Sequence, residues 1–520
     1  MTTPLVHIPD RFNAASFFVD RNIAEGRGDK IAFVHEDRTV TYRQLQEMVN
    51  RVGNALLDHG VEAEQRVLLI LMDCPEFVAS FFGAIKIGAV PVPVNTMMRA
   101  EDYLYFLTDS RARAAIIAEP LLAEVGRILG RAKHLKHVIV LGRAEGAHIA
   151  FDEWVADAST TLTATDTSKD DAAFWLYSSG STGFPKGVVH LQHDMVVCSD
   201  MYALQVLGIT ERDRTFSAAK LFFAYGLGNA MYFPMRVGAQ AVLYPHRPVA
   251  EAVFQVIDRH RPTLFFAVPT LYAGMLEVKD AEKRFDCSSL RLCVSAGEAL
   301  PPDLYRRWVE KFHVELIDGI GTTETLHIFL SNRPGNVKPG SSGLPVPGYE
   351  AAIVDDEGKP VPRGEVGNLR VKGDSTMAYY WNLHEKTKET LFGPWIVTGD
   401  KFYEDEEGYF WYCGRSDDML KVGGMWVSPV EVENALVAHP AVLEAAVVGQ
   451  EDADKLVKPR AYVVLKDKYI DSVELEDELK RFVKGTIAPY KYPRWIEFVR
   501  ELPKTATGKI QRFRLRRKAP

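Results

Sequence analysis

The sequence contains few cysteines and no pattern that would use them. Five cysteines occur in 520 residues, none of them in a CxxC pair or beside a histidine-rich motif. We therefore expect neither a disulfide framework nor a cysteine-based zinc site, and a reducing cytoplasm is the compartment that fits this usage.

Long apolar runs and an excess of basic charge are also missing. The most apolar long window, residues 77–94, is interrupted by Lys86 and two prolines, and residues 1–13 lack a basic segment with an apolar core. We expect no membrane span and no signal peptide. With 69 acidic and 62 basic residues, the net charge of −7 argues against general nucleic-acid binding. These absences indicate a soluble, cytoplasmic protein.

Strand-like and helical segments alternate through most of the chain. Residues 39–60 are typical of a helix that Thr41 and Gln44 can cap and that Gly60 can end. Short apolar runs at 66–72, 114–117 and 138–141 are typical of buried strands. The alternation predicts an α/β fold with parallel sheets, and the length predicts two or more domains.

The pattern changes after residue 340. Short alternating strands with Gly and Pro turns predict a small antiparallel barrel over about 338–414. Paired acids and paired glycines within 414–424 are typical of a hinge. The last hundred residues predict a compact unit with helices at 429–439 and 473–487 and strands at 445–449 and 460–465. We predict a large N-terminal domain of residues 1–416 and a mobile C-terminal lid of residues 417–520.

The stretch at 178–187, SSGSTGFPKG, follows a strand-like run and combines three glycines with hydroxyl side chains and Lys186. Glycines let the backbone turn and present N–H groups, so the loop is suited to gripping a polyphosphate. It is not a Walker A loop, because Pro185 precedes the lysine and Gly187 follows it. From the residues alone, a flexible surface loop is the alternative.

Two later segments carry candidate site residues. Residues 220–228, KLFFAYGLG, predict either a core strand that turns at glycines or an aromatic wall of a flat apolar pocket. Residues 318–324, DGIGTTE, place two threonines and Glu324 at the end of a short strand. Such a group can bind phosphate oxygens and a Mg²⁺ ion.

Taken in order, these motifs resemble those of the adenylate-forming superfamily over nearly the whole chain. Within it the sequence is most similar to bacterial benzoate-CoA ligases, on the stretches 175–183, 217–229, 318–321 and 326–329. The resemblance implies a large adenylation domain of several subdomains, a small α+β lid, and an active site between them.

The resemblance also assigns residues to roles. Nucleotide binding falls to the phosphate loop and to the motifs after it: Ser178, Ser179, Gly180, Ser181, Thr182, Gly183, Lys186, Gly297, Glu298, Asp318, Thr323, Asp400 and Arg415. The implied catalytic residues are Lys509, Thr182, Lys186 and Glu324. Glu324 would hold Mg²⁺, Lys509 would serve the adenylation step, and Asp417 would be the hinge. Ile320 departs from many relatives, which carry an adenine-stacking aromatic there.

The expected reaction joins an aromatic carboxylate to coenzyme A in two steps, with ATP consumed and an acyl-adenylate formed between them. We expect the aryl ring to lie among Phe223, Ala224, Tyr225, Ala296, Gly321, His327 and Ile328. A ligase for 4-hydroxybenzoate or 2-aminobenzoate, an enzyme that loads a carrier protein, and a non-catalytic nucleotide-binding regulator are the alternatives. The oligomeric state stays open, with a homodimer as one option.

Overall fold

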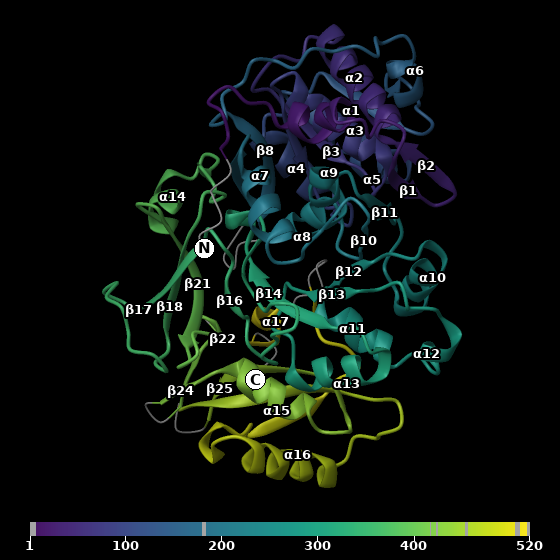
Figure 1. Cartoon of the computed structure of the whole chain (residues 1–520). Helices are drawn as coiled ribbons and strands as arrows, with labels where there is room; N and C mark the ends of the chain where they lie inside the picture. Colours follow the sequence, from purple (N-terminus) through teal and green to yellow (C-terminus); the bar gives the residue numbers. More distant parts are fainter. Residues whose placement is uncertain are drawn as a thin grey trace.

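The computed structural model describes residues 7–178, 184–416, 418–422, 425–452, 456–504 and 510–516. Figure 1 shows a large part, built from the N-terminal and middle regions of the chain, and a small C-terminal part at the bottom of the view. The α/β fold with a large N-terminal and a small C-terminal domain is confirmed.

The first sheet of the large domain is parallel and wholly made of short apolar strands. Its order is β4 (Val90–Pro93), β3 (Arg66–Ile70), β5 (Ala114–Ala118), β6 (His137–Leu141) and β7 (Ile149–Ala150). Helix α2 (Tyr42–Asp58) precedes this sheet, and the predicted Thr41–Gln44 cap forms reciprocally at its start. The predicted strands at 66–72, 114–117 and 138–141 are therefore confirmed.

The second sheet has nine strands and carries most of the candidate site. Its order is β16 (Leu344–Pro345), β15 (Ile328–Ser331), β14 (Leu316–Gly321), β13 (Leu292–Ser295), β12 (Leu264–Ala267), β10 (Arg214–Ser217), β11 (Gln240–Leu243), β1 (Ile31–His35) and β2 (Arg38–Thr41). The strands from β14 to β1 are parallel, so the loops after β10, β12, β13 and β14 leave the sheet at one edge.

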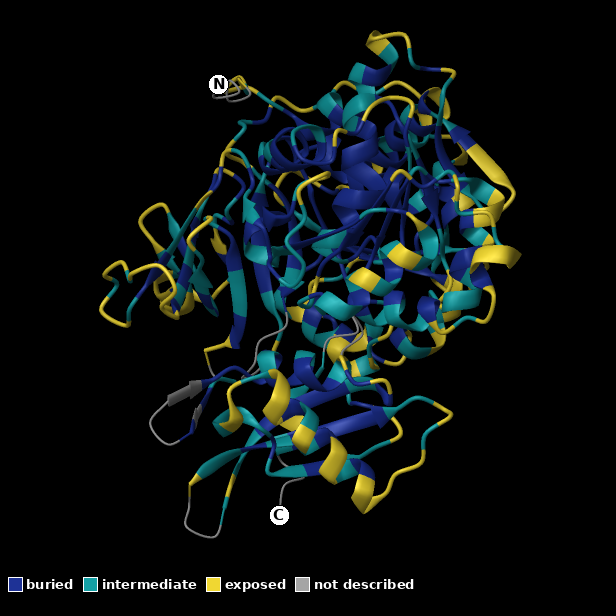
Figure 2. Ribbon diagram, turned by 60° about the horizontal axis from the view of Figure 1, so that its bottom comes forward, coloured by how far each residue is buried: buried dark blue, intermediate teal, exposed yellow. Residues whose placement is uncertain are grey.

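Helices pack around these two sheets, and Figure 2 shows the buried residues concentrated between them. One continuous apolar core joins the two sheets through α2 and α3. The helices of the large domain are α1 (Arg21–Ala24), α3 (Pro75–Lys86), α4 (Ala100–Asp109), α5 (Glu119–Val125), α6 (Phe151–Ala156), α7 (Asp194–Cys198), α8 (Ala224–Leu227), α9 (Phe233–Val237), α10 (Ala250–His260), α11 (Pro269–Leu276), α12 (Ala281–Arg284), α13 (Pro302–Phe312) and α14 (His384–Thr390).

Two antiparallel sheets complete the large domain. A small sheet of β19 (Tyr379–Tyr380), β9 (Lys186–Leu191) and β8 (Ala172–Ser178) carries the phosphate loop between β8 and β9. The predicted barrel-like region contains an antiparallel sheet of β17 (Glu350–Val354), β18 (Gly367–Lys372), β21 (Trp395–Glu404), β20 (Leu391–Phe392) and β22 (Phe410–Arg415).

The C-terminal domain has its own core. Strands β25 (Val442–Glu451), β26 (Val457–Leu465) and β27 (Trp495–Phe498) form its sheet, beside the hairpin β23 (Leu420–Val422) and β24 (Met425–Val427). Its helices are α15 (Pro429–Val437), α16 (Val473–Thr486) and α17 (Arg512–Arg516). The elements predicted at 429–439, 445–449, 460–465 and 473–487 are all present.

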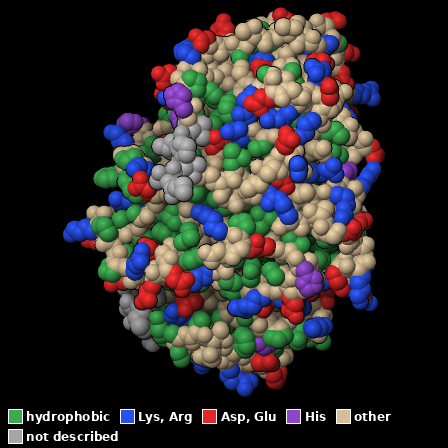
Figure 3. Space-filling model, viewed as in Figure 1, with side chains coloured by type: hydrophobic (Ala, Val, Ile, Leu, Met, Phe, Trp, Pro, Cys, Tyr) green, Lys and Arg blue, Asp and Glu red, His purple; other side chains and the backbone are tan. Residues whose placement is uncertain are grey.

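Basic and acidic side chains are mixed over the face shown in Figure 3, as the modest net charge suggests. No helix in the described part of the chain is both long and apolar enough to cross a membrane.

Candidate functional site

The two ends of the phosphate loop lie beside Glu324. Ser178 ends β8 and Lys186 begins β9, and the two residues are register partners in the hairpin. The hydroxyl of Ser178 donates to Glu324 Oε1 at 3.1 Å, and Lys186 Nζ lies 3.8 Å from the same oxygen. Burial lowers the pKa of Lys186, and the nearby Glu324 carboxylate partly offsets that shift. A carboxylate, a hydroxyl and an ammonium group thus meet where polyphosphate binding was predicted.

Tyr380 contacts the same charged side chains, although it was not among the predicted site residues. Strand β19 pairs with β9 and sets Tyr380 opposite Val188, two residues after Lys186. The Tyr380 hydroxyl donates to Glu324 Oε1 at 2.7 Å and accepts from Lys186 Nζ at 3.2 Å. In the sequence, Tyr380 stands out only as part of an isolated Tyr-Tyr pair, far from Lys186 along the chain. That signal is too weak to predict a site residue.

The segment that carries Glu324 is held rigidly. Thr322 and Thr325 form a reciprocal cap around a single 3₁₀ turn, Thr323–Thr325. The next residue, Leu326, has φ +66°, a conformation that a branched side chain rarely adopts. Because of this turn, Glu324 lies beside Ser178 and Lys186 at the two ends of the phosphate loop, while His327 lies among aromatic rings.

Aromatic rings surround His327. Its ring centroid lies 4.5 Å from that of Phe233, 5.4 Å from Tyr202 and 5.7 Å from Tyr225. Its Nε2 atom donates to the Tyr225 carbonyl at 3.3 Å, and burial lowers the pKa of His327 to about 3. The imidazole is therefore neutral at ordinary pH and adds no charge to this aromatic cluster.

The predicted ring-binding residues meet here in large part. Tyr225 lies at the start of α8, and its hydroxyl donates to the carbonyl of Val294 in β13 at 3.0 Å. Ala296, which directly follows β13, is buried. A Cβ atom added at Gly321 would lie 2.4 Å from the carbonyl oxygen of His327, so only glycine permits this close approach of β14 to β15.

Three details of this aromatic cluster differ from what the sequence predicted. The core-strand alternative for 220–228 is wrong, because β10 ends at Ser217 and the segment forms a turn and then α8. Phe223 precedes α8, and its ring contact is with Phe222 at 4.5 Å rather than with the His327 group. Tyr202 and Phe233 were not predicted, since each lies in a helical run without a recognisable motif.

The residues predicted to bind the adenosine group lie on separate elements. Asp318 is buried in β14, and burial raises its pKa well above the ordinary value. Within the described residues, its Oδ1 atom is buried without a hydrogen-bond partner. Gly297, with φ +97°, follows β13 and leads into Glu298. Ile320, in β14, is partly buried and packs against the main apolar core.

Asp400 and Arg415 pair across neighbouring antiparallel strands. They are register partners in β21 and β22, and Arg415 Nη1 donates to Asp400 Oδ1 at 3.1 Å. Gly399 has φ +75°, which turns the strand just before the nearly buried Asp400 carboxylate.

The C-terminal domain reaches this region through its last described segment. Ile510 donates its backbone N–H to Glu298 Oε1 at 3.0 Å, across 212 residues of sequence. Helix α17 follows Ile510, and its first residue, Arg512, donates to Glu433 Oε2 in α15 at 2.7 Å. The predicted residues Ser179, Gly180, Ser181, Thr182, Gly183, Asp417 and Lys509 lie outside the described part of the chain.

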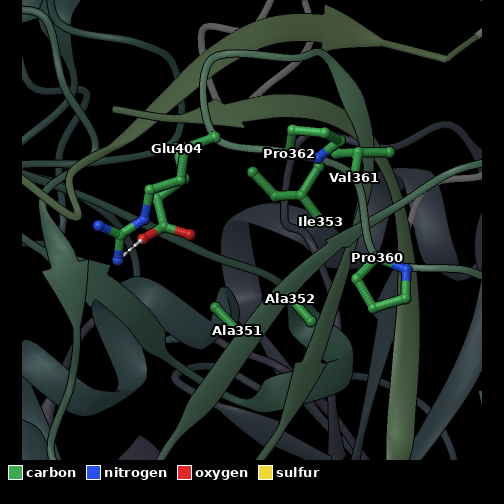
Figure 4. Close-up of a pocket in the computed structure, with 8 residues that line it drawn as sticks. Ala351, Ala352, Ile353, Pro360, Val361, Pro362 and Glu404 are labelled. Carbon is green, nitrogen blue, oxygen red and sulfur yellow. Dashed lines mark ion pairs between the residues drawn. The ribbon is translucent and has the colours of Figure 1, made fainter. Parts of the chain in front are cut away.

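A hollow on the barrel-like region lies apart from these residues. Figure 4 shows it between Ala351, Ile353, Val361 and Glu404, and Arg363 pairs with Glu404 at 2.9 Å there. It brings together none of the predicted site residues.

Comparison with known proteins agrees with this arrangement. Residues 20–381 match the family described as AMP-binding enzyme, and residues 431–509 match the AMP-binding enzyme C-terminal domain. The chain belongs to the AMP-binding enzyme family. The expected membership of the adenylate-forming enzymes is thereby confirmed.

Relatives of this AMP-binding enzyme extend over its full length. It is 51% identical to a benzoate–CoA ligase of Thauera aromatica, over 99% of this chain and 98% of the relative. It is 47% identical to a 4-hydroxybenzoate–CoA/benzoate–CoA ligase of Rhodopseudomonas palustris, over 97% of this chain and 94% of the relative.

Two solved structures are similar throughout. The anthranilate CoA ligase AuaEII in complex with anthranoyl-AMP has a TM-score of 0.95 and 47% identity, covering 98% of each chain. A benzoate CoA ligase from Burkholderia xenovorans LB400 has a TM-score of 0.91 and 48% identity, covering 97% of this chain and all of that one.

Proposed function

We propose that this enzyme is an ATP-dependent benzoate–CoA ligase that forms AMP. In the first step a benzoate oxygen attacks the α-phosphorus of ATP, the bond from that phosphorus to the bridging oxygen of the β-phosphate breaks, and diphosphate leaves. In the second step the CoA sulfur attacks the acyl carbon, the thiol proton is lost, and AMP leaves. The observation that supports this most is the uncharged aromatic cluster around His327, which one short turn joins to the charged group of Lys186 and Glu324.

The charged group supplies what the first step needs. Benzoate and ATP are both anions, so the repulsion between them must be offset by preorganised positive charge and hydrogen-bond donors. We assign Lys186 and Thr182 to the β- and γ-phosphates, Thr323 to the α-phosphate, and Lys509 to the reacting carboxylate. The register pairing of Lys186 with Ser178 in the hairpin of β8 and β9 supports the assignment of Lys186.

Mg²⁺ fits the residues that are present, with Glu324 as its protein ligand. The described residues contain no group of three or more His, Cys, Asp or Glu side chains that could hold a metal by themselves. Mg²⁺ characteristically uses one or two carboxylates together with substrate phosphates and water. When bound, the ion would neutralise phosphate charge that develops as diphosphate leaves.

The remaining assignments follow the same logic. We propose that Asp318, Gly297 and Glu298 bind the adenine and that Asp400 accepts from the ribose hydroxyls. The other nucleotide contacts would come from Ser178, Ser179, Gly180, Ser181, Gly183 and Arg415. The benzoate ring would lie among Phe223, Ala224, Tyr225, Ala296, Gly321, His327 and Ile328.

The lid would rotate about Asp417 between the two steps. The contact of Ile510 with Glu298 joins the C-terminal domain to the proposed adenine site and supports a part for this domain in the reaction. We also propose a cytoplasmic location, because the five cysteines carry free thiols and the reaction draws on ATP and CoA.

The test is a panel of aryl acids assayed with ATP and CoA. Benzoate, 4-hydroxybenzoate, 2-aminobenzoate and acetate are each incubated with enzyme and MgCl₂, and AMP and the acyl-CoA product are quantified. We expect the highest kcat/KM with benzoate and no thioester without CoA. Preference for a substituted ring would move the assignment to that acid. Absence of AMP formation with every aryl acid would overturn the proposed function.

A further inference from the structure

The Tyr380 hydroxyl bonds to both charged groups of the phosphate site, which themselves form only a long ion pair. Its hydroxyl lies 2.7 Å from Glu324 Oε1 and 3.2 Å from Lys186 Nζ, whereas the direct distance between those charged atoms is 3.8 Å. The ammonium group also lies 4.4 Å from the centre of the Tyr380 ring, over its face. A phenol has a single hydroxyl proton, so it donates to the carboxylate and accepts from the ammonium group.

The hydroxyl remains neutral in this position. Tyr380 is 3% exposed, and an ordinary phenol is uncharged at neutral pH. It therefore satisfies both charges in part without adding a charge of its own.

Without this hydroxyl, we expect Lys186 and Glu324 to approach more closely than the present 3.8 Å. Lys86 and Asp20, another poorly exposed pair in this chain, meet at 2.7 Å with no group between them. Lys186 and Glu324 in direct contact at such a distance would be occupied with each other. That pair would have to break before Lys186 could bind phosphate and Glu324 could bind the cation. Separating an ion pair in a weakly hydrated site is costly.

We propose that Tyr380 is a positioning residue that keeps Lys186 and Glu324 apart and available for the magnesium–ATP complex. The inference rests on the proposed function, because it takes MgATP as the ligand of this site. The hydroxyl holds both side chains in place before the nucleotide arrives, so less reorganisation accompanies binding. Tyr380 is not assigned any contact with the reacting atoms.

The experiment compares Tyr380→Phe with wild type and with a matched control. Phenylalanine retains the ring under Lys186 and removes only the hydroxyl. The control is Tyr42→Phe, since Tyr42 is fully buried in the N-terminal region and its hydroxyl donates to the Ala239 carbonyl at 2.7 Å. Binding of an ATP analogue with a methylene bridge between the α- and β-phosphates is measured by calorimetry across a series of Mg²⁺ concentrations, and Tm is recorded for each protein.

For Tyr380→Phe we expect Kd of the analogue at saturating Mg²⁺ to rise about ten-fold and the Mg²⁺ midpoint of binding to increase. Tyr42→Phe should lower Tm while leaving both binding quantities at their wild-type values. Conversion of supplied benzoyl-adenylate to benzoyl-CoA should be unaffected by Tyr380→Phe, because that step uses neither Lys186 nor Glu324.

The outcomes separate the two proposals. A wild-type protein that binds no nucleotide at any Mg²⁺ concentration would contradict the proposed function itself. Normal wild-type binding together with an unchanged Kd and Mg²⁺ midpoint in Tyr380→Phe would overturn the role of Tyr380. A lower Tm as its only effect would assign Tyr380 to structure alone.

Discussion

Replacing Gly321 by alanine should damage the aryl pocket while leaving the nucleotide site usable. The added Cβ would lie 2.4 Å and 2.6 Å from the carbonyl oxygen and carbon of His327, and 2.8 Å from the Ile328 nitrogen. These are backbone atoms, so no side-chain rotation can relieve the overlap. The backbone of β15 must move away from β14 by about 1 Å to restore ordinary contact.

Both stability and catalysis should register this movement. Overpacking of a core typically costs about 1–3 kcal/mol, which we expect as a lower Tm. His327 and Ile328 would move with the backbone, and a misplacement of about 1 Å in a substrate-positioning group can reduce the rate by about 10²-fold. We therefore expect kcat/KM for benzoate to fall by about two orders of magnitude, with Kd for the ATP analogue unchanged.

The chain offers a matched control in Gly485→Ala. Gly485 lies in α16 of the C-terminal domain, and a Cβ added there would meet no atom within 4 Å. That variant should keep wild-type kinetics and gain about 0.5–1 kcal/mol from improved helix propensity. Wild-type kcat/KM for benzoate in a folded Gly321→Ala protein would refute the placement of the ring beside β14 and β15.

Three further predictions concern other parts of the site. Ala224→Leu should lower benzoate turnover while sparing ATP binding, since a hydrophobic slot discriminates small additions by about 1–3 kcal/mol; unchanged turnover would show that Ala224 lies away from the ring. Lys509→Ala should slow benzoyl-adenylate formation by about 10²–10³-fold or more, because it removes a charged donor, yet largely spare conversion of supplied adenylate to thioester; comparable adenylation by both proteins would sink the assignment. His327 has a pKa of about 3 in the folded chain, below the ordinary 6.5. Between pH 3 and 6.5 the unfolded chain therefore binds more protons at this residue than the folded chain does. The free energy of unfolding should fall by about 1.36 kcal/mol per pH unit as pH drops below 6.5. Melting curves of His327→Gln between pH 5 and 7 should show a shallower dependence than wild type, and an identical slope would argue against the buried neutral imidazole.

Local sequence signals determined much of the secondary structure and the order of the motifs. The Thr41–Gln44 cap forms as expected, because a capping box satisfies backbone groups within one turn and needs no distant partner. The short apolar runs became buried parallel strands, since both faces of such strands are covered. The motif residues Ser178, Lys186 and Glu324, which the sequence marks separately, lie in contact with one another.

Tertiary structure alone decided how distant segments complete the site. Tyr380 is 56 residues from Glu324 and 194 from Lys186, and only the pairing of β19 with β9 brings its hydroxyl between them. Residues 220–228 form a turn and α8 rather than a strand, although their apolar and aromatic composition is also typical of strands. The close packing of backbone around Gly226 favours the turn. The low pKa of His327 arises from complete burial among rings drawn from separate helices. Periodicity and motif spacing describe neighbours along the chain, whereas burial and the pairing of remote groups depend on how the whole chain packs.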